Sequence, residues 1–151
     1  MGTAGPIGLA KDYLLEDNTE GLFFVINSDV VAQYDLESLL KFHKKHGKEA
    51  TVNVKGVEDP AKHGVVVSND SGLVSEYVDK PDEFISNKVN AGIYCFNTSV
   101  IDKVPCRPSS LENDLLPRLA QDGNLYCIEI EGYWMDIGLP HNYLLGVQLH
   151  L

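Results

Sequence analysis

The amino-acid sequence predicts an α/β domain with a mixed, mostly parallel sheet that is flanked by helices. Residues 22–26 are five apolar residues in a row without alternation, a pattern typical of a strand that is covered on both faces. Segments with helical spacing of apolar residues alternate with such strand-like runs along the chain. The 151 residues are 44% hydrophobic and 23% charged, which suits a folded domain with its own core.

The first half of the chain predicts two helices and two strands. Pro6 favours the first turn of a helix that runs to about Glu16, and the strand at 22–26 follows it. Asp35 is expected to open a second helix, which Gly47 ends. One face of that helix carries Leu36, Leu39, Leu40 and His43. Alternating apolar residues predict the next strand at 51–57.

The second half predicts a hairpin, two more strands and two helices. Residues 64–67 and 73–78 flank the turn-rich segment 69–72, which indicates a β-hairpin. Ser109, with Glu112 three residues later, has the spacing of a capping box for a helix that reaches about Ala120. The remaining elements are strands at 90–96 and 125–130 and a closing helix that begins at Pro140.

The charge balance restricts the kinds of partner. Twelve basic residues stand against 22 acidic ones, so the net charge is −10, and we expect neither nucleic-acid nor anionic-membrane binding. A phosphate ligand must then be held by a few placed cations, a metal ion or backbone amides. The three cysteines, Cys95, Cys106 and Cys127, form no close pair, which favours reduced thiols in a cytoplasmic protein.

Two aspartates are candidate ligands for a hard divalent cation. Asp29 follows the apolar strand at 22–26, where ligands bind in open α/β sheets. Asp136 lies in an apolar, aromatic segment beside Trp134, the single tryptophan. Mg²⁺ is typically held by one or two carboxylates together with substrate phosphates and water. The alternative is that both are unrelated turn residues, because 107 positions of separation say nothing about distance.

Other candidates are weaker when taken alone. Lys80 follows a strand and precedes Pro81, which biases it toward an extended conformation in which its amine meets a phosphate; the alternative is a surface lysine. Asn90 stands beside small residues that permit close approach of a ligand, or simply tight packing. His43 and His46, near a helix end with two lysines, are interpreted as solvated side chains rather than metal ligands.

Taken together, the segments resemble the GDP-mannose pyrophosphorylases, which are mannose-1-phosphate guanylyltransferases of the sugar-1-phosphate nucleotidyltransferase family. The resemblance covers essentially the whole chain and rests on an ordered set of motifs. These are GTAGP at 2–6, NSDV at 27–30, FHKKHG at 42–47, GVVV at 64–67, VDKP at 78–81, NAGIY at 90–94 and WMDIG at 134–138.

The resemblance implies transfer of a guanylyl group from GTP to mannose 1-phosphate, giving GDP-mannose and pyrophosphate. Asp29 and Asp136 match the family's carboxylates for Mg²⁺, and Lys80 matches the lysine that grips the sugar phosphate. The positions that match the sugar and base contacts are Gly64, Asp79, Asn90 and Trp134 for the sugar, and Gly2 and Thr3 for the base. Asp79 stands where the family usually has glutamate, so its carboxylate is one methylene shorter.

The resemblance also implies that residues 1–151 are the central and C-terminal part of a Rossmann-like, glycosyltransferase-A-like catalytic domain. The family's glycine-rich nucleotide loop lies upstream of the GTAGP segment, and its β-helix domain lies downstream. We therefore expect activity from a longer parent, as a homo-oligomer or with a regulatory subunit, and none from this fragment alone. The alternatives are a non-catalytic regulatory subunit and an enzyme with a different base or sugar specificity.

Overall fold

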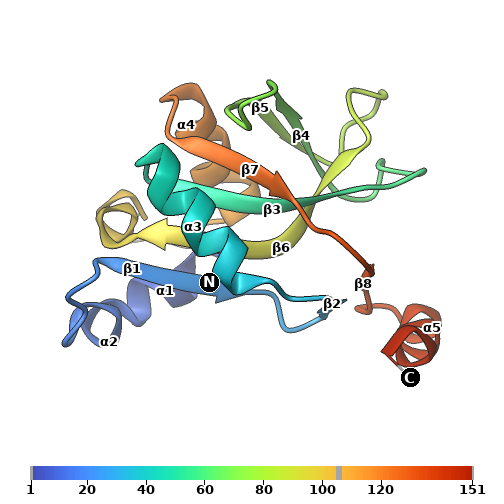
Figure 1. Ribbon diagram of the computed structural model, residues 1–151, viewed down its shortest axis with the longest axis horizontal. Helices are drawn as coiled ribbons and strands as arrows, with labels where there is room; N and C mark the ends of the chain where they lie inside the picture. The colour runs from blue at the N-terminus through green and yellow to red at the C-terminus, as the bar shows by residue number, and fades with distance from the viewer. Residues whose placement is uncertain (1, 105–106, 151) are drawn as a thin grey trace.

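Strand β6 (Lys88–Asn97) is the centre of a six-stranded sheet in the computed structural model, which describes residues 2–104 and 107–150 (Figure 1). The strand order is β5-β4-β6-β3-β7, and β1 also pairs with β6. These strands are β1 (Leu22–Ile26), β3 (Ala50–Gly56), β4 (Gly64–Ser68), β5 (Val74–Asp79) and β7 (Leu125–Glu129). The α/β class and each of the strands predicted from the sequence are confirmed.

The directions of the strands differ from the expected mostly parallel sheet. Only β3 and β7 pair in parallel among the described strands, while β6 is antiparallel to β1, β3 and β4, and β4 to β5. The segment that misled the prediction is β1, where Phe24 and Ile26 remain 38% and 42% exposed. An unbroken apolar run reflects the polarity of a strand's surroundings and carries no information about the direction of its neighbour.

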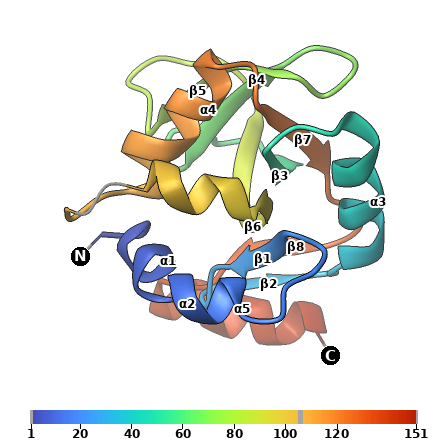
Figure 2. The same cartoon turned by 90° about the vertical axis from the view of Figure 1, so that its left-hand side faces the viewer.

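Helices cover both faces of the sheet (Figure 2). On one face, α3 (Leu36–His46) packs Leu39 against a cluster that includes Ile93 and Cys95 of β6. The other face is covered by α1 (Gly5–Leu9), the 3₁₀ helix η1 (Thr98–Lys103), the π-helical turn η2 (Leu111–Leu115) and α4 (Leu116–Gln121). The predicted first helix is divided at Ala10 into α1 and α2 (Lys11–Leu15).

The helix caps explain where two of these helices begin and end. Asp35 accepts a hydrogen bond from the backbone N–H of Ser38 at 2.9 Å, and Gly47 ends α3 with a left-handed φ of 64°, as the sequence indicated. The cap of η2 is Ser110 rather than Ser109, because the Ser110 hydroxyl accepts from the N–H of Asn113 at 3.2 Å. Ser109 is buried instead, and its carbonyl accepts from the Ala4 N–H. Only Ser109 has a glutamate three residues later, so the capping-box spacing selected the wrong one of two adjacent serines.

A chain of buried hydrogen bonds joins α3 to the sheet and corrects the prediction of solvated histidines. His43 is buried, and its ring nitrogens lie 2.7 Å from the Thr51 hydroxyl and 2.8 Å from Asn97 Oδ1. His46 Nε2 lies 2.7 Å from the same hydroxyl, and its Nδ1 accepts from the Lys48 N–H. The Lys48 contact requires His46 to be a neutral ring, and burial lowers the pKa of His43 and favours its neutral form as well.

A second, two-stranded sheet lies beside the main one and was not predicted. In it, β2 (Val30–Ala32) pairs antiparallel with β8 (Trp134–Asp136), so that Val30 faces Asp136 and Ala32 faces Trp134. Helix α5 (Pro140–His150) follows and lies next to β8 (Figure 1). Strands of three residues are too short to produce a readable alternation of apolar and polar residues.

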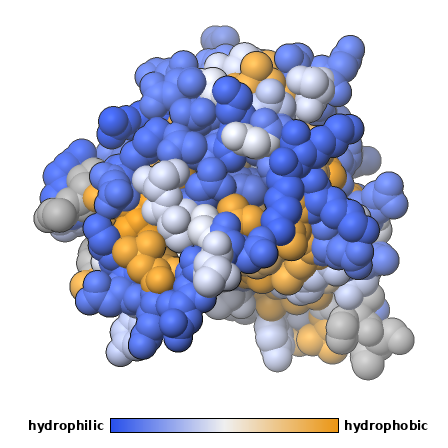
Figure 3. Space-filling model, turned by 60° about the vertical axis from the view of Figure 1, so that its left-hand side comes forward, coloured by the Kyte–Doolittle hydropathy of each residue, from blue (hydrophilic) through white to orange (hydrophobic). Residues whose placement is uncertain are grey.

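The face of the molecule seen in Figure 3 is mostly polar, and a few hydrophobic areas interrupt it. Among the described residues, none of the helices has the length and apolar character needed to cross a bilayer.

Candidate functional site

The pairing of β2 with β8 brings the two predicted metal ligands together. Asp29 immediately precedes β2, Asp136 ends β8, and the Asp29 carbonyl accepts a hydrogen bond from the Ile137 N–H at 2.8 Å. A Cβ atom built on Gly138 would lie 3.1 Å from Asp29 Oδ2 and 3.1 Å from Asp136 Oδ1. Both carboxylates thus border the same small space, with those two oxygens at most about 6 Å apart.

This pair suits a cation that takes its remaining ligands from elsewhere. Oxygens that share one Mg²⁺ lie about 3–4 Å apart, a separation within the bound set by Gly138. The Gly138 N–H donates to Asp136 Oδ1 at 2.8 Å and so orients that carboxylate. Within residues 2–104 and 107–150, no group of three or more histidine, cysteine or acidic side chains is placed to hold a metal. A bound phosphate and water would have to complete the coordination.

A cleft of about 410 Å³ contains most of the residues that the sequence singled out. Eight of the nine line it, and these are Thr3, Asp29, Gly64, Asp79, Lys80, Asn90, Trp134 and Asp136. Gly2 does not line the cleft: it has φ +73° and packs against the Ser109 backbone so closely that a Cβ would overlap it. Segments that are more than 100 positions apart in the sequence therefore share one cavity.

Lys80 lies in the cleft with an unusual backbone conformation. Its φ is +47°, in the left-handed region, so the expected extended conformation is wrong. The cause is a tertiary contact that overrides the bias from Pro81: the Lys80 N–H donates to the His63 carbonyl at 3.1 Å, just beyond the end of β5. A non-glycine residue held at positive φ stores strain, and such residues are enriched at functional sites.

Lys80 and Lys62 bring positive charge to a cleft that is otherwise acidic. The carboxylates that line it are Asp29, Asp79, Glu112 and Asp136. An isolated phosphate would be repelled by this set, whereas a phosphate accompanied by a divalent cation would meet opposite charge on both components. The charges of the cleft therefore suit a phosphate group accompanied by a divalent cation better than a phosphate group alone.

Asn90 and Trp134 form two walls of the cleft. The Trp134 indole N–H donates to the Ala91 carbonyl of β6 at 2.9 Å, and its ring meets His63 edge-on with centroids 5.6 Å apart. The Asn90 amide donates to the Tyr77 and Tyr94 hydroxyls at 3.0 and 2.8 Å. Both side chains are thus held by the sheet before any ligand arrives.

Thr3 connects the start of the chain to η2. Its hydroxyl donates to Glu112 Oε2 at 2.5 Å and accepts from the Leu111 N–H at 2.8 Å. Thr3 therefore positions Glu112 at the edge of the cleft, a role that the motif match alone did not indicate.

Several residues of the cleft were missed from the sequence. Lys62 and His63 precede β4 without a motif of their own, and Tyr77 stands next to Val78 in β5 and resembles a core residue. Glu112 was interpreted only as part of a helix cap. Lys62 and His63 could have been predicted from their position next to Gly64. No sequence feature marks Tyr77 as a residue of the cleft.

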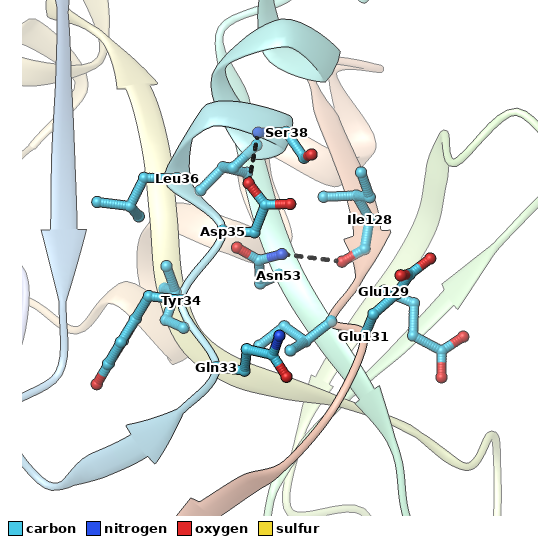
Figure 4. Close-up of a pocket in the computed structure, with 12 residues that line it drawn as sticks. Gln33, Tyr34, Asp35, Leu36, Ser38, Asn53, Ile128, Glu129 and Glu131 are labelled. Atoms are coloured by element: carbon cyan, nitrogen blue, oxygen red, sulfur yellow. Dashed lines mark hydrogen bonds between the residues drawn. The ribbon is translucent and has the colours of Figure 1, made fainter.

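A second cavity, of about 280 Å³, lies at the beginning of α3 (Figure 4). Asp35, Asn53, Glu129 and Glu131 contribute its polar groups, and none of the described residues that line it is basic. Its shortage of cationic groups makes it a poor site for phosphate, so the cleft at Lys80 is the better candidate.

The fold and this cleft together define a nucleotidyltransferase-type domain. The model of the nucleotidyl transferase family matches residues 1–149, and the chain belongs to this family. It is similar, at 47% identity over its whole length, to mannose-1-phosphate guanyltransferase beta-A of Xenopus laevis, and, at 48%, to mannose-1-phosphate guanylyltransferase 1 of Arabidopsis thaliana. The resemblance stated from the motifs is thereby confirmed. The chain spans 42% of the length of each relative.

Solved structures share the fold. A protein from Bacillus anthracis described as a glucose-1-phosphate thymidylyltransferase superposes with a TM-score of 0.82 at 23% identity, over 98% of this chain and 60% of the other. HddC from Yersinia pseudotuberculosis gives 0.79 at 24% identity, over 100% of this chain and 63% of the other. These likenesses support the architecture of the sheet and its helices.

Proposed function

We propose that this chain carries the sugar-phosphate and metal-binding part of a mannose-1-phosphate guanylyltransferase. The reaction joins GTP and mannose 1-phosphate into GDP-mannose and releases pyrophosphate. The observation that carries the proposal is that Lys80, Asp29 and Asp136, separated widely in sequence, line one cleft. The names of the relatives that are 47–48% identical over the whole chain support the choice of mannose and guanine.

The residues of the cleft suit an in-line displacement. A phosphate oxygen of the sugar phosphate attacks the α-phosphorus of GTP, the new P–O bond forms, and the bond to pyrophosphate breaks. The Lys80 ammonium holds the attacking phosphate as a point charge and offsets its repulsion from the triphosphate. Asp29 and Asp136 would hold Mg²⁺, which when bound neutralises charge on the phosphate oxygens. The protein's contribution is to position the reactants and to supply charge.

The sugar would lie between β4, β5 and β6. Asp79 and Asn90 offer polar groups for its hydroxyls, Gly64 leaves room, and Trp134 supplies an apolar wall. Thr3 would lie toward the nucleotide. Gly2 is outside the cleft and supports this region through Ser109.

We further propose a cytoplasmic location and a parent protein that assembles with itself or with a regulatory subunit. Cys95 and Cys127 are free thiols, in keeping with a reducing compartment. The joint presence of Asp29, Lys80 and Asp136 in one cleft favours the catalytic rather than the regulatory role.

Calorimetric titration of the chain with mannose 1-phosphate and Mg²⁺ tests the proposal. We expect binding by the native chain and a loss of about tenfold or more in affinity for Lys80→Ala, since a charged contact to phosphate is removed. Lys41→Ala is the matched control, because Lys41 pairs with Glu37 on the outer face of α3 and does not line the cleft. Equal affinities of the two variants would reject Lys80 as the phosphate ligand, and stronger binding of glucose 1-phosphate would reject mannose.

A further inference from the structure

Tyr77 lies in the cleft although nothing in its sequence context indicates a ligand. It stands on β5, is 5% exposed and lines the cavity that holds Lys80. Its ring reaches across to Gly64 on β4, where a Cβ atom would overlap the Tyr77 hydroxyl and the ring carbon that bears it. Gly64 is therefore the residue that lets this hydroxyl occupy its place.

The hydrogen bonds of Asn90 determine what it can offer to a ligand. Its two amide hydrogens are directed to the Tyr77 and Tyr94 hydroxyls, and its Oδ1 accepts from the Gly92 N–H at 2.9 Å. The opposite amide orientation would place the NH₂ group against the Gly92 N–H, so the network fixes the assignment. Asn90 is left with one lone pair on Oδ1. It can accept a hydrogen bond from a ligand but has none to donate.

The Tyr77 hydroxyl supplies the missing donor. Its oxygen accepts from Asn90, and its own hydrogen has no acceptor among the contacts of the described residues. Burial, together with Tyr94 and the carboxylates of Glu112 and Asp79, raises the pKa of Tyr77, so the phenol stays protonated. Tyr94 has the same bond to Asn90 but is fully buried and does not line the cleft.

We propose that the Tyr77 hydroxyl donates a hydrogen bond to a hydroxyl of the bound sugar phosphate and, together with Asn90 as acceptor, determines which sugar is accepted. A sugar hydroxyl is both donor and acceptor, so it matches this pair of groups. This inference rests on the proposed function, because it assigns the same cleft to the sugar. The inference adds Tyr77 as a specificity-determining residue that contacts the sugar rather than the phosphate group.

Calorimetric titration of Tyr77→Phe and Tyr94→Phe with mannose 1-phosphate and with inorganic phosphate, each in the presence of Mg²⁺, tests the inference. We expect Tyr77→Phe to weaken binding of the sugar phosphate by about 5- to 20-fold and to leave the affinity for inorganic phosphate unchanged. Tyr94→Phe should change either affinity by less than about threefold. Thermal unfolding of both variants checks that they remain folded.

The outcomes separate this inference from the proposed function. Native affinity in Tyr77→Phe, or an equal loss in Tyr94→Phe, would overturn the direct contact, since the second result would mean that Tyr77 acts only by orienting Asn90. A parallel loss of inorganic phosphate binding would also overturn it. If the native chain prefers another sugar 1-phosphate, the mannose assignment fails while the comparison of the two variants continues with that ligand. Absence of binding of any sugar 1-phosphate would overturn both.

Discussion

Protonation of His46 should destabilise the contact between α3 and the sheet. In the folded chain, the Lys48 N–H donates to His46 Nδ1, so the proton of the neutral ring is on Nε2 and points to Thr51. The Thr51 hydroxyl then donates to His43 Nδ1, and His43 Nε2 donates to Asn97. A second proton, on His46 Nδ1, would face the Lys48 N–H, which is also a donor, and the hydrogen bond between these two groups would be lost. The ring also stacks on Tyr126 with centroids 4.3 Å apart, which confines it further.

The size of the effect follows from the pKa of His46. Burial, followed by the neighbouring His43 and Lys48, lowers that pKa from 6.5 to about 4. Between these two pKa values the unfolded chain binds a proton on His46 that the folded chain does not bind. The free energy of unfolding therefore falls as the pH drops from above 6.5 toward 4. The full difference is worth about 3 kcal/mol, and partial solvent access reduces it to about 1–2 kcal/mol. Burial lowers the pKa of His43 as well, with the same sign.

Thermal unfolding of the chain at pH 7 and pH 5 measures about half of this difference, because the loss is complete only below about pH 4. A change of about 0.5–1 kcal/mol should lower Tm by about 1–4 °C for a chain of this size. Carboxylates with lowered pKa, such as Asp35 and Glu49, lose their stabilising effect only at more acidic pH, so this window isolates the histidines. His46→Gln should lose most of the pH dependence, and the exposed His141→Gln should keep it. An unchanged Tm from pH 7 to 5, or the same slope in His46→Gln, would refute the reasoning.

Two further predictions concern the cleft. Asp136→Asn should weaken the binding of Mn²⁺, used as a probe of the proposed Mg²⁺ site, by about tenfold or more, because one charged ligand becomes neutral. Electron paramagnetic resonance measures this affinity. Asp102→Asn, on the surface beside Lys11, is the control, and equal Mn²⁺ affinities of the two variants would show that Asp136 is not a ligand. Gly64→Ala should lower the free energy of unfolding, measured in urea, by about 1–3 kcal/mol, because the added methyl group overlaps Tyr77. Gly8→Ala is the control, since its methyl group makes only an ordinary contact with Val104 and should be neutral or stabilising. An unchanged stability of Gly64→Ala would show that the Tyr77 ring moves aside freely.

The predictability of the fold depended on the length of each element. The helix from Leu36 to His46 carries a cap, an apolar face and a terminal glycine, so three independent signals agreed on its position. Strand β2 has three residues, and its partner β8 is about a hundred positions away, so neither gives a local signal. The direction of strand pairing was beyond the sequence patterns, because polarity reports burial and not orientation.

The site was predictable where a motif marks it and not where tertiary contacts define it. The resemblance led to Lys80, Asp29 and Asp136, which line one cleft. It did not indicate that Lys80 has a left-handed backbone, since the hydrogen bond to His63 comes from another strand end. Tyr77 could not be predicted as a site residue, because a partly apolar side chain on a strand is equally typical of the core. The structure shows that its hydroxyl lies in the space left by the missing side chain of Gly64.

The division into two sheets has a mechanical consequence. Asp29, Asp136 and Trp134 lie in or beside the short β2–β8 ribbon, whereas Asn90 belongs to the large sheet and Lys80 directly follows its strand β5. A tilt of the ribbon would change the distance between the two aspartates and Lys80 while the strands of the large sheet stay paired. The hydrogen bond from the Trp134 indole N–H to the Ala91 carbonyl connects the ribbon to the large sheet and limits how far the two sides of the cleft can separate.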